Sequence, residues 1–221
     1  GNFYNENAGF TCNGGTFELY GSDNTIHNTA GYFHDLLIEG IYTCPTDLLI
    51  NGNFYPNNLF TFEGNELTCM GDVELYYGEL LLTEGSTLRL NNNSSLSVGF
   101  FSYFNSTGTA GEMNLVTGVN PGDRYNFTVE SNAAIIASYT IFENMSANGI
   151  YMSEGSGFLD QGFYGCTFRN GAEGGTLLTL NSTYSDVIIG AVFENNSDGA
   201  AFNVTKTNDQ GEVTLTDYSG N

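Results

Sequence analysis

Carboxylates are the only abundant chemically active side chains of this chain. Its 221 residues include 25 Asp and Glu against four Lys and Arg, which gives a formal net charge of −21. Pairs such as Asp209 and Glu212 could hold Ca²⁺ loosely, but none has the spacing of a dedicated calcium loop. A solvated acidic surface is the alternative interpretation. We therefore expect no metal site and no cofactor beyond weakly bound Ca²⁺.

Basic and nucleophilic groups are too sparse for catalysis. Enzymes that cut acidic polysaccharides need a base beside clustered carboxylates, and the three arginines here are scattered. His27 and His34 are seven positions apart with Asp35 beside the second, but no third and fourth ligand follows at a spacing that suits zinc. Nucleophile-elbow, zinc-protease and nucleotide-binding motifs are absent from the sequence. The sequence predicts a protein that is not an enzyme.

The charge also limits the partners. Nucleic acids and anionic membranes are bound through Lys and Arg, so neither is expected here, and no apolar run is long enough to insert into a membrane. The chain has 14 Tyr, several of which fall in or beside expected strands, where an outward ring could stack on a sugar. The tyrosines in question are Tyr76, Tyr77, Tyr103 and Tyr151. An extracellular glycan is therefore one candidate partner.

Four cysteines are present without a CxxC motif, which argues against a redox or zinc site. Cys44 and Cys69 are separated by one period of the repeat described below, so they could stack and form a disulfide, or fill the core as small apolar groups. Eight N-x-S/T sequons also occur in the chain. Asn105, in an irregular stretch, is the most accessible candidate for glycosylation.

A threefold repeat defines the elements that carry these side chains. Phe, followed two positions later by Asn, recurs at an almost constant interval. The positions are Phe142 and Asn144, Phe168 and Asn170, and Phe193 and Asn195. Each period consists of short β-branched and aromatic runs broken by Gly, Asn and Ser, which indicates strands. A period of about 25 residues suits one turn of a β-solenoid and is too short for a propeller blade.

Stacked turns predict two ladders of side chains. The phenylalanines should lie above one another in the interior, about 4.8 Å apart, and the asparagines should form an amide ladder at one corner. Between Phe and Asn, Arg169 takes the position that Glu143 and Glu194 hold in the neighbouring turns. This predicts an ion-pair stack on the surface.

Earlier in the chain, short apolar triplets follow one another closely, and three of them make one turn of the coil. Their outer members should point inward and their middle members outward. The triplets are Leu67–Cys69, Val73–Leu75, Leu80–Leu82, Leu88–Leu90 and Leu96–Val98. This pattern predicts a three-sided coil.

We expect one all-β domain, a single-stranded right-handed parallel β-helix of about nine rungs, each about 21–26 residues long. A rung is one full turn of the coil. Residues 14–218 form the helix, with an irregular corner loop at about 105–123. Residues 1–13 are expected to be an N-terminal arm or cap, and residues 219–221 a tail.

The Phe and Asn steps, together with the run LLINGNFYPN followed by GNELTCMGDVELYYGELLLTEGSTLRL, resemble right-handed parallel β-helix modules of secreted bacterial surface proteins. These modules form a non-enzymatic branch of the pectate-lyase-like solenoid fold. The resemblance covers residues 14–218. It implies export and a role as a stalk, adhesin or surface fibre.

These observations favour a non-catalytic extracellular structural protein, a β-solenoid protomer that self-assembles end to end into a surface filament or layer. The alternative is a carbohydrate-binding or adhesin module of a larger exported protein. A polysaccharide-degrading enzyme is the third hypothesis.

Overall fold

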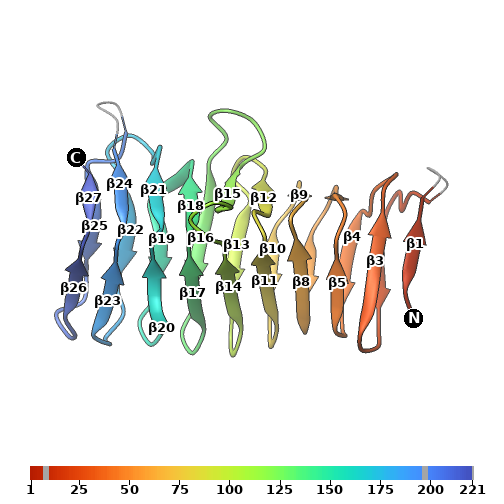
Figure 1. The fold of residues 1–221 in the computed structure, drawn as a ribbon, viewed down its shortest axis with the longest axis horizontal. Helices are drawn as coiled ribbons and strands as arrows, with labels where there is room; N and C mark the ends of the chain where they lie inside the picture. The colour runs from red at the N-terminus through yellow and green to blue at the C-terminus, as the bar shows by residue number, and fades with distance from the viewer. Residues whose placement is uncertain (7–9, 196–198, 221) are drawn as a thin grey trace.

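The computed structural model describes residues 1–6, 10–195 and 199–220, and only the backbone of residues 160 and 161. In these parts of the chain it is all-β: 27 strands form three sheets in which the strands pair in parallel. Successive strands pass from sheet to sheet, so a strand pairs with the strand about three later in the chain. Figure 1 shows the rungs side by side along the long axis, with the two termini at opposite ends. The predicted parallel β-helix of about nine rungs is confirmed.

Sheet 1 has ten strands: β1 (Phe3–Asn5), β3 (Asn24–Asn28), β5 (Tyr42–Cys44), β8 (Leu59–Glu63), β11 (Glu79–Thr83), β14 (Tyr103–Thr107), β17 (Ala134–Ser138), β20 (Gly157–Tyr164), β23 (Asp186–Ile189) and β26 (Val213–Thr216). Sheet 2 has nine: β2 (Thr16–Leu19), β4 (Asp35–Ile38), β7 (Phe54–Pro56), β10 (Val73–Leu75), β13 (Ser95–Val98), β16 (Tyr125–Val129), β19 (Met145–Met152), β22 (Thr176–Leu180) and β25 (Phe202–Lys206). Sheet 3 has eight: β6 (Leu48–Ile50), β9 (Glu66–Cys69), β12 (Thr87–Leu90), β15 (Asn114–Gly118), β18 (Thr140–Glu143), β21 (Thr167–Arg169), β24 (Val192–Glu194) and β27 (Ser219–Gly220).

The core follows the two-residue alternation of the strands. In the triplets predicted from the sequence the outer residues are at most 2% exposed, and the middle residues are more exposed. Because successive side chains of a strand point to opposite faces, each triplet supplies two residues to the interior. The three inward faces meet in one continuous apolar core.

Rung length varies more than the repeat in the sequence predicts. Tyr42 pairs with Phe60 across a short rung, whereas Phe104 pairs with Ile135 across a rung that is more than half as long again, and both lie outside the expected range. The strands keep their stacking because the additional residues fall between them, in the connections that follow β14 and β15. A corner can take such insertions at little cost, since it does not interrupt a ladder.

The corner loop predicted at residues 105–123 is wrong in its extent. β14 runs through Thr107 and β15 begins at Asn114, so only shorter connections on either side of β15 are irregular. The polar inward residues of this region satisfy one another. Asn114 Nδ2 donates to Ser106 Oγ at 3.0 Å and to the Leu82 carbonyl at 2.9 Å, and Ser106 Oγ lies 2.7 Å from Thr140 Oγ1. A buried polar network of this kind lets strands form without apolar inward residues.

Residues 1–13 were expected to form an arm or a cap, and the described ones, 1–6 and 10–13, contribute to the first rung. β1 pairs with β3, and the backbone N–H of Cys12 donates to the Tyr32 carbonyl at 3.1 Å. Phe3, Phe10 and Phe17 meet edge to face with ring centroids 5.1–5.4 Å apart. This triad packs on Phe33 of the next rung and covers the N-terminal end of the core.

The opposite end of the core is formed by partly buried aliphatic residues. Val204 of β25 and Val213 and Leu215 of β26 pack against the core but are only partly buried. Residues 219 and 220, expected to be part of a tail, form β27 and pair with β24. Residue 221 lies outside the described residues.

Candidate functional sites

The repeated phenylalanines lie in register inside the core. Phe142 pairs with Phe168, and Phe168 pairs with Phe193. The rings are nearly parallel, with centroids 5.5 and 5.3 Å apart. The three side chains are almost wholly buried, so this ladder stabilises the fold and is not accessible to a ligand.

The predicted ion-pair stack on the same strands is confirmed. Arg169 Nε lies 2.7 Å from Glu143 Oε2, and its NH1 nitrogen lies 3.7 Å from Glu194 Oε2. One guanidinium therefore bridges carboxylates of the two adjacent rungs. Because the arginine is about one third exposed, the pairs are structural supports of modest energy.

The repeated asparagines occupy the corner that follows these strands. Asn144 and Asn170 have left-handed backbones, with φ of 63° and 52°. Asn144 Nδ2 donates to Thr117 Oγ1 at 3.0 Å, and Asn195 Nδ2 donates to the Ala200 carbonyl. Asn tolerates this conformation better than most residues, so these positions serve the turn.

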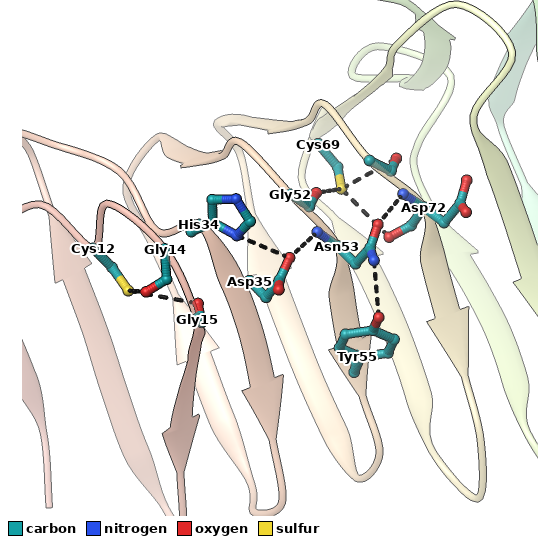
Figure 2. A network of polar contacts seen from close by, with 11 residues as sticks. Cys12, Gly14, Gly15, His34, Asp35, Gly52, Asn53, Tyr55, Cys69 and Asp72 are labelled. Carbon is teal, nitrogen blue, oxygen red and sulfur yellow. Dashed lines mark hydrogen bonds and ion pairs between the residues drawn. The ribbon is translucent and has the colours of Figure 1, made fainter.

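A second polar ladder, which the sequence analysis missed, runs along the corner before sheet 2. Asp35 Oδ1 accepts the backbone N–H of Asn53 at 2.7 Å, Asn53 Oδ1 accepts that of Asp72 at 2.9 Å, and Asp72 Oδ1 accepts that of Ser95 at 2.8 Å. Figure 2 shows the first two of these contacts. Each side chain thus bonds to the backbone of the next rung. A signal was present: an Asx residue begins β4 and directly precedes β7 and β10.

The histidines do not form a metal site with this ladder. His34 Nδ1 lies 3.3 Å from Asp35 Oδ1, and His27 stacks on Tyr4 with ring centroids 5.0 Å apart. Within the described residues, no group of three or more His, Cys, Asp and Glu side chains could hold a metal ion.

The disulfide between Cys44 and Cys69 is not formed. Cys44 lies on β5 of sheet 1 opposite Phe62, whereas Cys69 lies on β9 of sheet 3 between Ile50 and Leu90, and both thiols are free. The prediction assumed a constant rung length, but the local rungs are shorter. Burial raises the pKa of Cys44 to about 11 and that of Cys69 to about 12, so neither is a reactive thiolate at neutral pH. Cys69 Sγ instead contacts the Gly52 carbonyl at 3.3 Å (Figure 2).

Asn105 lies within β14 rather than in a loop. Its backbone is paired with Leu81 on one side and Ile136 on the other, and its side chain donates from Nδ2 to Glu79 Oε1 at 3.0 Å. The side chain is on the outer face and partly exposed. Its glycosylation stays a prediction.

A cluster of exposed aromatic rings lies where sheet 2 connects to sheet 1. We call it the aromatic corner; its members are Tyr76, Tyr77, Phe100, Phe101 and Tyr103. Ring centroids are 4.7 Å apart for Tyr76 and Tyr77, and 4.2 Å apart for Phe100 and Phe101. Tyr76, Tyr77 and Phe101 are each more than half exposed. Tyr151, the fourth tyrosine considered, lies on sheet 2, where its hydroxyl accepts from Asn181 Nδ2 at 3.3 Å.

The aromatic corner has a hollow beside it. Tyr77, Phe101 and Tyr103 line a depression of about 200 Å³, together with Asn58, Leu59, Gly78 and Glu79. Rings and polar side chains therefore share one surface. The sequence contained a signal for this cluster, because two aromatic pairs, Tyr76-Tyr77 and Phe100-Phe101, are separated by one local rung. The same number of residues separates Glu79 from its strand partner Tyr103.

The backbone of the aromatic corner is strained. Tyr77 and Phe101 have φ of 59° and 53°, in the left-handed region that bulky residues rarely adopt. In the next two rungs the equivalent positions are held by Asn132 and Gly155. Backbone hydrogen bonds show the equivalence: the Phe101 N–H donates to the Asn132 carbonyl, and the Asn132 N–H donates to the Gly155 carbonyl. Asn and Gly suit this conformation. Two aromatic residues occupy it here without burying their rings, and strain of this kind is often found at binding sites.

Comparison with protein-family models, with curated proteins and with solved structures gave no match. Among the described residues, no helix is long and apolar enough to cross a membrane. The class of the protein is therefore defined by its fold, a parallel β-helix, and its role is argued from its surfaces.

Proposed function

We propose that the chain is a non-catalytic extracellular structural protein, a β-solenoid protomer that stacks end to end into a surface filament or layer. The observation that carries this proposal is the last rung. Val204, Val213 and Leu215 face the core there but are only partly buried, unlike the inward residues of the inner rungs.

Backbone geometry supports the same proposal. The outer edge of a last parallel rung presents N–H and C=O groups that another strand can pair with. At the other end, β1 and β2 offer a parallel edge beside the triad of Phe3, Phe10 and Phe17. Joining one end to the other is a head-to-tail contact, which propagates into a filament when the rotation between copies does not close a ring.

The test compares two substitutions on β26. Leu215→Glu places a charge on the inward side of the last rung, whereas Thr214→Glu adds the same charge on the exposed outer side. Wild type should form filaments or sheets in negative-stain electron microscopy and show a mass that rises with concentration in light scattering. Leu215→Glu should stay monomeric with an unchanged β-sheet circular dichroism spectrum, and Thr214→Glu should assemble. A wild-type protein that is monomeric at every concentration would refute the proposal.

A second candidate function, a carbohydrate-binding or adhesin module of a larger exported protein, is supported by the aromatic corner. Exposed rings on a rigid scaffold can stack on the apolar faces of sugar rings, and Asn58 and Glu79 offer polar groups to sugar hydroxyls. The net charge of −21 repels acidic polysaccharides, so the expected ligand is a neutral glycan.

Glycan-array binding tests this second function. Tyr103→Ala, in the hollow, should weaken binding by about threefold to tenfold, the value of one aromatic stacking contact. Tyr218→Ala is the matched control, because Tyr218 is 59% exposed but lies in the last rung. Equal effects of the two substitutions, or no bound glycan, would exclude the aromatic corner as the site.

A further inference from the structure

The register of the ladder between β17 and β20 shifts near a corner of the solenoid. Ile135 of β17 pairs with Phe158 of β20, and the next described pair joins Ala137 to Phe163. β20 therefore has three more residues than β17 between these two pairs. Among the described pairs, β20 pairs with β23 at Ile188 and Ile189. The start of β23 keeps its partners on the other side, in β26.

A pocket of about 340 Å³ lies at the starts of β20 and β23. We call it the β20–β23 pocket; its walls are Gly157, Phe158, Tyr184, Ser185, Asp186 and Val187. Its size is at the lower end of the range that holds small organic ligands.

Asp186 puts a buried carboxylate in the wall of the pocket. The residue is 4% exposed, and its Oδ2 atom has no hydrogen-bond partner among the described residues. Lys206 is the cation that acts on this carboxylate, but it directs its Nζ to the carbonyls of Ser182 and Gln210, both at 2.7 Å. Burial raises the pKa of Asp186 to about 6, and Lys206 opposes that shift. A buried carboxylate of this kind is expected to take a hydrogen-bond donor.

Two aromatic rings line the same pocket. Phe158 packs edge to face on Phe163 with ring centroids 5.1 Å apart. Gly162 leaves room for the Phe158 ring, because a Cβ at this position would be 2.6 Å from the ring. Tyr184 is 56% exposed and its ring lies against Gly157. The pocket therefore combines one acceptor with aromatic walls.

We propose that the β20–β23 pocket binds a primary alkylammonium group, with the ammonium on the Asp186 carboxylate and the methylene chain against Phe158 and Tyr184. An ammonium supplies both a positive charge and three donors to the buried carboxylate. Aromatic faces also attract such cations. The net charge of −21 raises the local concentration of cations around the protein.

A metal ion fits the pocket less well than an amine. Ca²⁺ requires six to eight oxygen ligands and Mg²⁺ near-octahedral geometry. Asp186 is the only carboxylate among the walls of the pocket that the described residues form.

The test titrates cadaverine (1,5-diaminopentane) into the wild-type protein and follows binding by NMR chemical shifts and calorimetry. Asp186→Asn should weaken binding by at least about tenfold, because it leaves the ammonium without its buried counter-charge. Glu212→Gln removes the same charge from an exposed position next to β26, and should change affinity by less than about twofold. Tyr184→Ala tests the aromatic wall and should weaken binding by about threefold.

Further probes identify the source of the ammonium group. Saturable binding of N-acetyl-lysine-methylamide at the same residues would support a lysine side chain of a partner as the source, and binding of cadaverine alone would support a free amine. 1-Pentanol, which has a similar chain but no charge, should not bind. The proposal is overturned if cadaverine does not shift residues of the pocket, if 1-pentanol binds equally well, or if Asp186→Asn and Glu212→Gln weaken binding equally.

Discussion

At the scale of single residues, Asp186 shows how position changes the chemistry of a carboxylate. Its pKa rises from 3.8 to about 6 because it is buried. Between about pH 4 and pH 6 the folded protein therefore keeps a proton on Asp186 that the unfolded chain releases. Because of this difference, the contribution of Asp186 to the free energy of unfolding falls as the pH rises through this window, and the loss is complete above about pH 6.

Asp186→Asn should remove this loss of stability. The variant should be more stable than wild type by about 1–2 kcal/mol at about pH 7 and nearly equal to it at about pH 4. Urea unfolding followed by circular dichroism across this range measures the difference. A difference that is the same at both pH values would show that the substitution acts through packing and not through the charge.

The strained residues of the aromatic corner give a second prediction at this scale. Phe101→Gly relieves the left-handed backbone, so it should leave stability unchanged or raise it by up to about 1 kcal/mol. Phe127→Gly, which removes a fully buried ring from an ordinary strand position, should cost several times as much, about 4 kcal/mol or more. Thermal unfolding of both variants makes the comparison. A large loss for Phe101→Gly would mean that its ring supports the fold.

At the scale of elements, β18, β21 and β24 show what joins one rung to the next. Their inward faces carry the stacked phenylalanines, and their outward faces carry the bridge from Arg169 to Glu143 and Glu194. The two faces should contribute very different energies, because one is buried and the other is partly exposed to solvent.

Phe168→Ala should destabilise the protein by about 3–5 kcal/mol, since it removes a ring that contacts Phe142, Phe163 and Phe193. Arg169→Ala, the next residue on the same strand, should cost about 1 kcal/mol or less. Urea unfolding distinguishes them, and hydrogen exchange shows whether the loss is confined to neighbouring rungs, as expected for a solenoid. Equal losses would contradict the assignment of stability to the inner face.

At the scale of the whole molecule, a net charge of −21 is distributed along a rod of about nine rungs. The charge opposes contact between copies, while the partly buried aliphatic residues of the last rung favour it. Assembly should therefore depend on how far the repulsion is reduced.

Lowering the pH toward about 4, or adding Ca²⁺, should promote self-association. Light scattering measures it, with NaCl at matched ionic strength to separate screening from binding of Ca²⁺. The Leu215→Glu variant should remain dispersed under the same conditions, which distinguishes ordered stacking from precipitation. Stronger assembly at low salt and high pH would contradict the view that charge repulsion opposes stacking.

The fold, and the apolar residues that face the core, could be predicted from the sequence alone. Apolar residues at alternate positions of short strands, and the recurrence of Phe142, Phe168 and Phe193, are local patterns, and a strand converts them directly into inward and outward faces. The coil of about nine rungs followed from them. The ion pairs of Arg169 followed too, because those rungs have nearly equal lengths.

Where the rung length changes, the folded structure sets which side chains from different rungs become neighbours. Rungs differ widely in length, from the short one that pairs Tyr42 with Phe60 to the long one that pairs Phe104 with Ile135, so a constant period misplaces contacts wherever a corner gains or loses residues. That is why Cys44 and Cys69 lie on different sheets. It is also why the pocket at Asp186 could not be derived by counting, because β20, which forms one of its walls, carries three additional residues. The aromatic corner, in contrast, recurs after one local rung and could have been found from the sequence.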